Sequence, residues 1–275
     1  MPLQKTIAKA AKYTGVGLHS GRDVTITLRP APAGSGITFV RVDLPDSPRV
    51  KAMAANVTAT MRATTLEDGA AKVFTVEHLL AAFSALGVDN CLVEITSVEP
   101  PVADGSALPF AQLILEAGIV EQPTPRIDLT IAEAVTVRMP DKFIAILPYD
   151  GLRISFTSVN PHPLIGTQFG DYDISSEIFL REIAPARTIG FMHEVAALQK
   201  QGLALGGSLE NAVVYDDDKL LTPLRFPDEL VRHKILDVIG DLALAGRVRG
   251  HVIAVQSGHA LNTALARQIL ASAQK

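Results

Sequence analysis

The sequence predicts an α+β protein of two similar layered halves, each composed of a sheet and two helices. First, alternating apolar and polar residues, the pattern of half-buried strands, recur in both halves of the 275-residue chain. Second, each half contains two apolar-periodic segments of helix length. Third, hydrophobic residues make up 48% of the chain, which is enough to fill the core of one large domain or two ordinary ones.

The N-terminal half is predicted to begin with a strand, a turn at residues 30–34 that contains proline and glycine, and a second strand. A helix at residues 75–87 is predicted next, with Thr75 as its N-cap and Gly87 as its C-terminal stop. A short apolar strand and a second helix that ends at Gly118 follow. The predicted strands lie at residues 24–28, 37–42 and 91–95, and the second helix at residues 109–117.

The segment Pro123-Thr124-Pro125 interrupts these patterns and is predicted to link an N-terminal domain, residues 1–122, to a C-terminal domain, residues 127–275. The second domain contains the same kinds of element, although no residue-level repeat relates the two. Within residues 188–221, a helical stretch at 195–201 and a Gly206-Gly207 turn predict a β-α-β insertion near a binding site. The other predicted elements are strands at 127–137, 143–147 and 152–157, and helices at 228–245 and 262–273.

Charge and cysteine content exclude several classes of function. The formal net charge is -4, so the chain lacks the basic surface with which proteins bind nucleic acid nonspecifically. It has no run of eighteen apolar residues and no apolar signal core near Met1, so we expect a soluble cytoplasmic protein with no membrane span. The single cysteine, Cys91, lies in an apolar stretch and is expected to be a core residue.

One predicted helix carries a stripe of potential metal ligands. His233, Asp237 and Asp241 recur at every fourth residue and therefore share one face of the helix at 228–245, away from its apolar face. An imidazole and a carboxylate one turn apart can reach the same metal ion, and zinc accepts both kinds of ligand. The same spacing also occurs on helix faces that are merely solvated, so the stripe alone leaves both interpretations open.

Two further histidines lie near predicted helix ends. Glu77 and His78 fall in the first turn of the helix at 75–87, where the helix dipole favours a carboxylate. A glutamate beside a ligating histidine can accept a proton from an attacking water. His259, in the turn Ser257-Gly258-His259 before the last helix, is a candidate acid. A stabilising helix-end charge and an ordinary surface histidine are the alternative interpretations.

Together these residues form a complete set for metal-assisted amide hydrolysis, with two histidines and one aspartate as ligands, one glutamate as base and one histidine as acid. The chain has no H-E-x-x-H motif, no cysteine cluster and no G-x-S-x-G elbow, which argues against familiar zinc-protease, structural-zinc and serine-hydrolase sites. Residues 202–208 contain glycines but no G-x-x-x-x-G-K-[ST] pattern, so we interpret them as a turn.

Several short segments together resemble one known family, the UDP-3-O-acyl-N-acetylglucosamine deacetylases of lipid A synthesis. They occur in the family's order between residues 14 and 262, and they include Thr75-Val76-Glu77-His78-Leu79 and the whole stretch from Val231 to Asp241. The other matching segments are residues 14–21, 104–106, 186–188, 205–208 and 257–262. The ordered set is specific, although each segment alone is not.

The resemblance implies two α+β domains with the active site between them, and a small insertion in each that together form a passage for the acyl chain. It also implies one Zn2+ held by His78, His233 and Asp237. The substrate would be a UDP-linked acylated amino sugar, and we expect the protein to act as a monomer. Phe191, Val195 and Leu198 are expected to help line the passage, because the insertion is richer in apolar residues than a plain loop needs.

The same match assigns catalytic roles. Glu77 would be the general base and His259 the general acid, with Asp241 orienting His259. Thr188 would help to stabilise the tetrahedral oxyanion, and Lys234 would face the substrate's diphosphate or the polar site. The implied reaction removes the N-acetyl group and releases acetate.

Two positions depart from the family's pattern. Asn160 stands where the family typically has an aromatic residue associated with the nucleotide base, and Ile189 stands where an aromatic commonly follows Ala-Arg-Thr. How the uracil is held and which chain length is preferred therefore stay open. Two other functions also stay open: a zinc deacetylase of another N-acetylated sugar nucleotide or amphiphile, and a metal-bearing binding protein without catalysis.

Overall fold

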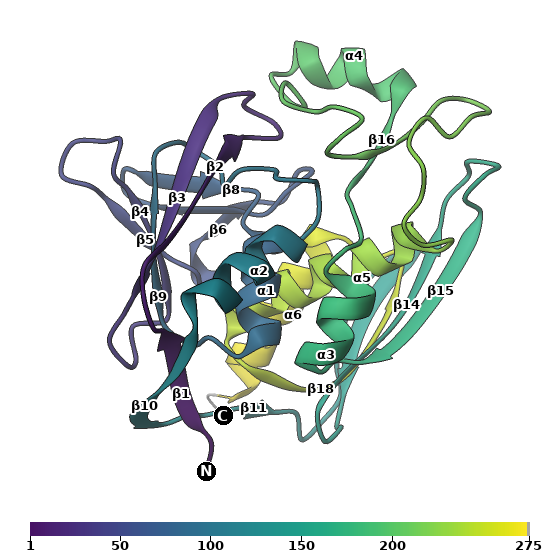
Figure 1. The fold of residues 1–275 in the computed structure, drawn as a ribbon. Coiled ribbons are helices and arrows are strands. Elements are labelled where there is room, and N and C mark those ends of the chain that lie inside the picture. Colours follow the sequence, from purple (N-terminus) through teal and green to yellow (C-terminus); the bar gives the residue numbers. More distant parts are fainter. Residues whose placement is uncertain (274–275) are drawn as a thin grey trace.

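A computed structural model describes residues 1–273 of the chain as two sheets with a layer of helices between them (Figure 1). In Figure 1 the N-terminal sheet lies on the left and the C-terminal sheet on the right, and the four long helices α1, α2, α5 and α6 fill the space between them. The α+β fold of two layered halves that the sequence predicts is confirmed.

The N-terminal sheet has five strands in the order β2-β3-β9-β4-β5. Neighbouring strands are antiparallel except β4 and β9, which are parallel. Val24, Ile26 and Leu28 alternate along β3 and are buried, so the pleat turns one face of the sheet toward the helices. The elements of this half are β2 (Ala11–Val16), β3 (Asp23–Pro30), β4 (Ile37–Arg41), β5 (Arg49–Lys51), α1 (Glu77–Leu86), β9 (Cys91–Ile95) and α2 (Leu108–Ala117).

The C-terminal sheet follows the path β12-β13-β18-β14-β15, and β11 also pairs with β18. Along this path only β14 and β18 are parallel. Its elements are β11 (Leu129–Thr130), β12 (Val135–Met139), β13 (Lys142–Leu147), β14 (Leu152–Val159), β15 (Thr167–Asp173), α5 (Glu229–Leu242), β18 (Val248–Val255) and α6 (His259–Ala273).

The two sheets have the same topology. Apart from β11 and the segments inserted after the fourth strand, each half has four strands in chain order, then a long helix, then the strand that enters the centre of the sheet, and then a second long helix. The central strand is parallel to the third of the four strands in both halves, namely β9 to β4 and β18 to β14. The similarity of the halves that the sequence suggests only as a pattern is therefore a similarity of strand order and direction.

Each half carries an insertion between its fourth strand and its first long helix. In the N-terminal half it is an antiparallel sheet of β6 (Val57–Ala59), β7 (Thr65–Asp68) and β8 (Ala71–Phe74). In the C-terminal half, β16 (Ile189–Phe191) and β17 (Val213–Tyr215) are parallel and connected through α4 (Met192–Lys200), which confirms the predicted β-α-β unit. The remaining elements are β1 (Leu3–Ile7), paired with β10 (Ile119–Pro125), and the short helices at Ala54–Asn56, Ser176–Ile178, Phe179–Ile183 and Ala243–Ala245.

The two halves share one hydrophobic core. Its buried side chains include Phe39 of the N-terminal sheet and Phe156 of the C-terminal sheet. Where α1 meets α5, a Cβ added to Gly240 would lie only 2.0 Å from the carbonyl oxygen of Glu77. Glycine at this position therefore lets α5 approach the first turn of α1 closely, which places the side chains of both helices at a common site.

Several local predictions are wrong. Thr75 is not an N-cap, because its φ is +56° and its hydroxyl donates to Glu99, while Val76 precedes α1 without a side-chain cap. The segment Pro123-Thr124-Pro125 is the end of β10, where Pro125 lies opposite Leu3 of β1. The strand predicted at 127–137 is two short strands, β11 and β12, and His259 begins α6 instead of preceding it.

Other predictions at the same scale are confirmed. Gly87 ends α1 with a φ of 74°, and its N–H donates to the carbonyl groups of Phe83 and Ser84. Cys91 is a buried free thiol in the core. Within residues 1–273, no helix has both the length and the apolar character needed to cross a bilayer.

Candidate metal centre and active site

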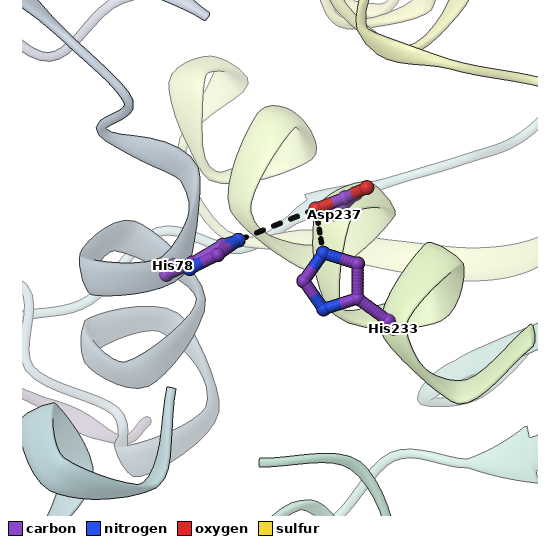
Figure 2. Close-up of side chains that lie close together, drawn as sticks. All are labelled: His78, His233 and Asp237. Carbon is purple, nitrogen blue, oxygen red and sulfur yellow. Dashed lines mark ion pairs between the residues drawn. The ribbon is translucent and has the colours of Figure 1, made fainter. Parts of the chain in front are cut away.

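Three potential metal ligands meet where α1 and α5 pack together. Figure 2 shows His78 of α1 pointing toward His233 and Asp237, which lie one turn apart on α5. Asp237 Oδ1 is 3.8 Å from Nε2 of His78 and 3.6 Å from Nε2 of His233. One ligand atom from each residue lies within 4.8 Å of the other two. Ligands held at about 2.0 Å from a tetrahedral ion are roughly 3.3 Å apart, so small shifts let all three share one cation.

The surroundings keep these side chains in the form that binds metal. Burial lowers the pKa of His78 to about 3 and also lowers the pKa of His233, so both imidazoles are neutral. Burial alone would raise the pKa of Asp237, but the positive charges of the Lys234 ammonium and of His259 outweigh it, and the pKa of Asp237 lies below its usual value. Asp237 Oδ1 is buried and finds no hydrogen-bond partner within residues 1–273. A buried carboxylate oxygen without a partner destabilises the folded protein unless a ligand binds to it, so the site fits a cation.

Neighbouring groups orient the potential ligands. His233 Nδ1 lies 3.1 Å from the carbonyl oxygen of Ala186, to which it donates when the ring proton is on Nδ1, and its Nε2 lone pair is then free for a cation. Lys234 Nζ donates to Asp237 Oδ2 at 2.6 Å. Lys234 therefore holds a potential ligand in place as well as lining the site.

Beside the three ligands, His259 lies between two carboxylates. Its Nδ1 donates to Asp241 Oδ2 at 2.9 Å, and its Nε2 is 3.8 Å from Glu77 Oε1. Asp241 also accepts from Thr64 Oγ1 at 2.5 Å and from Asn262 Nδ2 at 2.9 Å. The backbone N–H of Thr64 donates to Glu77 Oε2 at 3.1 Å, so this one residue fixes both carboxylates.

The surroundings of Glu77 and His259 shift the pKa values of both side chains, in a way that suits a general base and a general acid. Burial raises the pKa of Glu77 to about 7, because the positive charge of His259 opposes the effect only in part. Burial acts the other way on His259, but the carboxylates of Asp241 and Glu77 outweigh it and raise the pKa of His259 to about 10. Near neutral pH His259 is therefore cationic and Glu77 is close to half ionised, which suits proton donation and acceptance.

A cavity of about 580 Å³ opens onto these groups. Asp241 is fully buried behind His259 and does not line it. Thr188 lines the cavity from the loop before β16, where its N–H donates to the carbonyl of Gly105. Of the residues predicted from the sequence, the cavity is lined by His78, His233, Asp237, Glu77, His259, Thr188 and Lys234.

A second, mostly apolar cavity of about 350 Å³ lies beside the first, along α4. Phe191, Val195 and Leu198 all line it, as predicted for an apolar passage. The two cavities share six lining residues, so they adjoin each other: Leu18, His19, Arg62, Thr188, Ile189 and Phe191.

Sequence reasoning missed several residues of the site. The contact of Thr64 with Asp241 joins residues 177 positions apart, and no local pattern signals it. Asn262 follows His259 by three residues on α6, a spacing that places both on one helix face and could have identified it. Lys142 and Arg62 add positive charge to the lining of the larger cavity.

Comparison with known proteins agrees with this geometry. The model of the family described as UDP-3-O-acyl N-acetylglycosamine deacetylase matches residues 4–271. The UDP-3-O-acyl-N-acetylglucosamine deacetylase of Myxococcus xanthus (strain DK1622) is 51% identical over 270 residues, which cover 97% of this chain and 86% of that protein. Proteins of the same name from Anaeromyxobacter sp. (strain Fw109-5) and Geobacter sp. (strain M21) are 50% and 47% identical and cover 98% of this chain, which spans 88% and 90% of their lengths. The chain therefore belongs to the family of UDP-3-O-acyl N-acetylglycosamine deacetylases.

Proposed function

We propose that the protein is a zinc-dependent amide hydrolase that removes the N-acetyl group from UDP-3-O-acyl-N-acetylglucosamine and releases acetate, a step of lipid A synthesis. One observation carries the proposal: the acid–base pair Glu77 and His259 lies in the same cavity as a buried ligand set with an unsatisfied carboxylate oxygen. Family membership and the names of the relatives support the choice of substrate.

The chemistry of the ligand set favours zinc. Two imidazole nitrogens and one carboxylate oxygen, with a fourth position left open, are typical of catalytic zinc, whereas magnesium and calcium favour oxygen ligands. When bound, the ion would polarise the amide carbonyl and lower the pKa of water at the site. We assign His78, His233 and Asp237 as the residues that hold it.

Glu77 and His259 then move the protons. Glu77, fixed by the N–H of Thr64, accepts a proton from the water that adds to the amide carbon. His259 donates its Nε2 proton to the amine nitrogen as the C–N bond breaks, so acetate and a free amine result. Asp241 accepts from His259 Nδ1, which orients the ring and stabilises its charged form.

The other lining residues bind the remaining parts of the substrate. Thr188 lines the cavity, and its hydroxyl would donate to the oxyanion that forms on the amide oxygen. Lys142 and Lys234 supply positive charge for the diphosphate, and the apolar cavity takes the acyl chain. In this proposal the domain at 1–122 supplies Glu77, His78 and Thr64, and the domain at 127–275 supplies the other groups.

The test is acetate release from substrates that differ in one feature. We expect release from UDP-3-O-acyl-N-acetylglucosamine, much slower release from UDP-N-acetylglucosamine, which lacks the acyl chain, and none from Glu77→Ala protein that still binds the acylated substrate. Glu133→Ala, an exposed carboxylate outside both cavities, is the matched control. Equal rates with and without the acyl chain, or turnover by Glu77→Ala, would refute the proposal.

A second substrate is favoured by one observation. Asn160 lines the polar cavity where an aromatic side chain could stack on a nucleotide base. A different N-acetylated sugar nucleotide or amphiphile is therefore the alternative, and it would be identified by faster acetate release in the same assay.

A further inference from the structure

Arg62 lies at the junction of the two cavities described above. It comes from the loop between β6 and β7 of the N-terminal insertion and lines both the polar and the apolar cavity. Of the six residues shared by the two cavities, it is the only one with a permanently charged side chain. The catalytic steps described above do not use it.

The backbone at Arg62 is in an uncommon conformation. Its φ is +65°, in the left-handed region that a residue with a Cβ adopts only at some cost. This unfavourable conformation occurs where the loop directs a guanidinium toward the cavities. Such conformations are concentrated at binding and catalytic sites.

The guanidinium is held by the other insertion. Arg62 Nη2 is 3.1 Å from Glu194 Oε2, in the first turn of α4. Within residues 1–273, no hydrogen bond engages Nε or Nη1 of Arg62. Because guanidinium offers five N–H donors in a fixed plane, the pair with Glu194 orients Arg62 and leaves other donors for a ligand.

The two cavities fix where the parts of an acylated sugar would lie. The N-acetyl group must reach His78, His233 and Asp237 in the polar cavity, and the fatty chain fits the apolar cavity beside Val195 and Leu198. The ester that joins the chain to the sugar must then cross the junction. The carbonyl oxygen of this ester loses its hydrogen bonds to water when it enters the junction, so it needs a hydrogen-bond donor from the protein.

We propose that Arg62 is a specificity-determining residue that donates a hydrogen bond to the carbonyl oxygen of the 3-O-acyl ester. The inference rests on the proposed function and deepens it. Glu194 is a positioning residue for the guanidinium. His19 offers the competing donor at the junction, since its Nδ1 accepts from the N–H of Ala204 and its buried Nε2 has no partner within residues 1–273.

The alternative is that Arg62 only attaches α4 to the N-terminal insertion. Both partners are partly exposed, with side-chain accessibilities of 49% for Arg62 and 31% for Glu194, and exposed ion pairs contribute little to stability. The loop after α4 is also attached independently, because the N–H groups of Leu205 and Gly206 donate to the carbonyls of His19 and Leu18. The two roles predict different kinetics.

The experiment measures kcat and KM with the acylated substrate and with UDP-N-acetylglucosamine. For Arg62→Met we expect KM for the acylated substrate to rise about tenfold to a hundredfold, the usual worth of a hydrogen bond to a charged group, with little change for the substrate without the ester. Arg62→Lys keeps the charge and a donor, so KM for the acylated substrate should rise less than in Arg62→Met. Arg22→Met removes an exposed arginine that lines neither cavity, and it should behave as wild type.

A charge exchange separates recognition from attachment. The double variant Arg62→Glu with Glu194→Arg restores an ion pair between the insertions but moves the guanidinium to α4. We expect it not to recover the KM for the acylated substrate. Three results would overturn the assignment: a recovered KM in this double variant, an equal rise of KM for both substrates in Arg62→Met, or no rise of KM in Arg62→Met. If Arg62→Met shows no rise while His19→Gln raises KM for the acylated substrate alone, the ester is assigned to His19. Wild-type protein that releases no acetate from either substrate would instead refute the proposed function.

Discussion

At the scale of single residues, the neutral histidines and the ionised aspartate are expected to depend on one another for binding a cation. Alanine at His78, His233 or Asp237 should reduce bound zinc well below one equivalent, because two remaining ligands hold the ion poorly. His251→Ala is the control, since His251 contacts Ser155 on the C-terminal sheet and lies outside the cavity. Metal analysis of the purified variants tests this, and a full equivalent of zinc in all three would rule the site out.

Glu77 should make the metal-free protein less stable as it ionises. Its pKa is raised by burial to about 7 in the folded protein, whereas glutamate in an unfolded chain titrates near about 4.3. The cost of ionisation is therefore absent below the unfolded pKa, grows as the pH rises between the two values, and is complete above about pH 7. Metal-free Glu77→Gln should melt several degrees above metal-free wild type at pH 8, and this difference should shrink toward pH 5. A lower melting temperature than wild type at pH 8 would show that Glu77 is not destabilising.

The pH dependence of kcat/KM should be bell-shaped. Protonation of Glu77 removes the base on the acidic side, and loss of the proton of His259 removes the acid on the alkaline side. A bound divalent cation adds positive charge beside both groups and lowers both pKa values. The acidic limb should therefore lie below about pH 7 and the alkaline limb below about pH 10. Because the two groups interact, the apparent pKa values belong to the coupled site.

The variant His259→Ala separates the two limbs. It should lower kcat by about 10²-fold to 10⁴-fold, flatten the alkaline limb and keep its zinc. A wild-type kcat, or loss of the metal, would show that His259 has another role.

At the scale of elements, the close contact between α1 and α5 sets the spacing of the ligands. A methyl group at Gly240 would meet the backbone of Glu77, which cannot move aside as a flexible side chain could. Gly240→Ala should therefore destabilise the protein by about 1–3 kcal/mol or more and weaken zinc binding, because His78 moves away from His233 and Asp237. Gly190→Ala, at a position with open space, is the control for melting temperature. Unchanged stability and zinc affinity in Gly240→Ala would contradict this account of the site.

The elements also show what sequence patterns can and cannot predict. The end of α1 at Gly87 could be predicted, because a glycine in the left-handed conformation is a local requirement. The start of α1 could not, because Thr75 makes its hydrogen bond to Glu99 in the folded structure and not to the helix. Residues 123–125 were predicted to be a linker because Pro123 and Pro125 break the pattern. They are the end of β10, and the pairing of β10 with β1 depends on residues more than a hundred positions away.

Sequence patterns predicted only part of the candidate site. Spacing alone places His233 and Asp237 on one helix face, and counting the potential ligands added His78 from another helix, but no local pattern showed that the two helices meet. Thr64, which fixes both Glu77 and Asp241, has no sequence signal because its contacts are entirely long-range. Residues that share a helix face can thus be predicted from the sequence, whereas contacts between distant segments depend on how the elements pack.

At the scale of the whole molecule, the duplicated topology explains where the site lies. In each half an insertion follows the fourth strand and leads into the first long helix, α1 or α5. The common core packs these helices together, so the potential metal ligands and the proposed acid–base pair come from both halves, while the insertions supply Arg62 and part of the apolar lining. The site is therefore a property of the assembled pair of halves.

The most direct test of the central claim is acetate release from UDP-3-O-acyl-N-acetylglucosamine, measured on the same protein before chelation, after chelation and after zinc is restored, together with its metal content. We expect about one zinc per chain in the active protein, loss of acetate release in proportion to the zinc removed, and recovery as one equivalent is added back. Full acetate release by protein that contains no metal would contradict it.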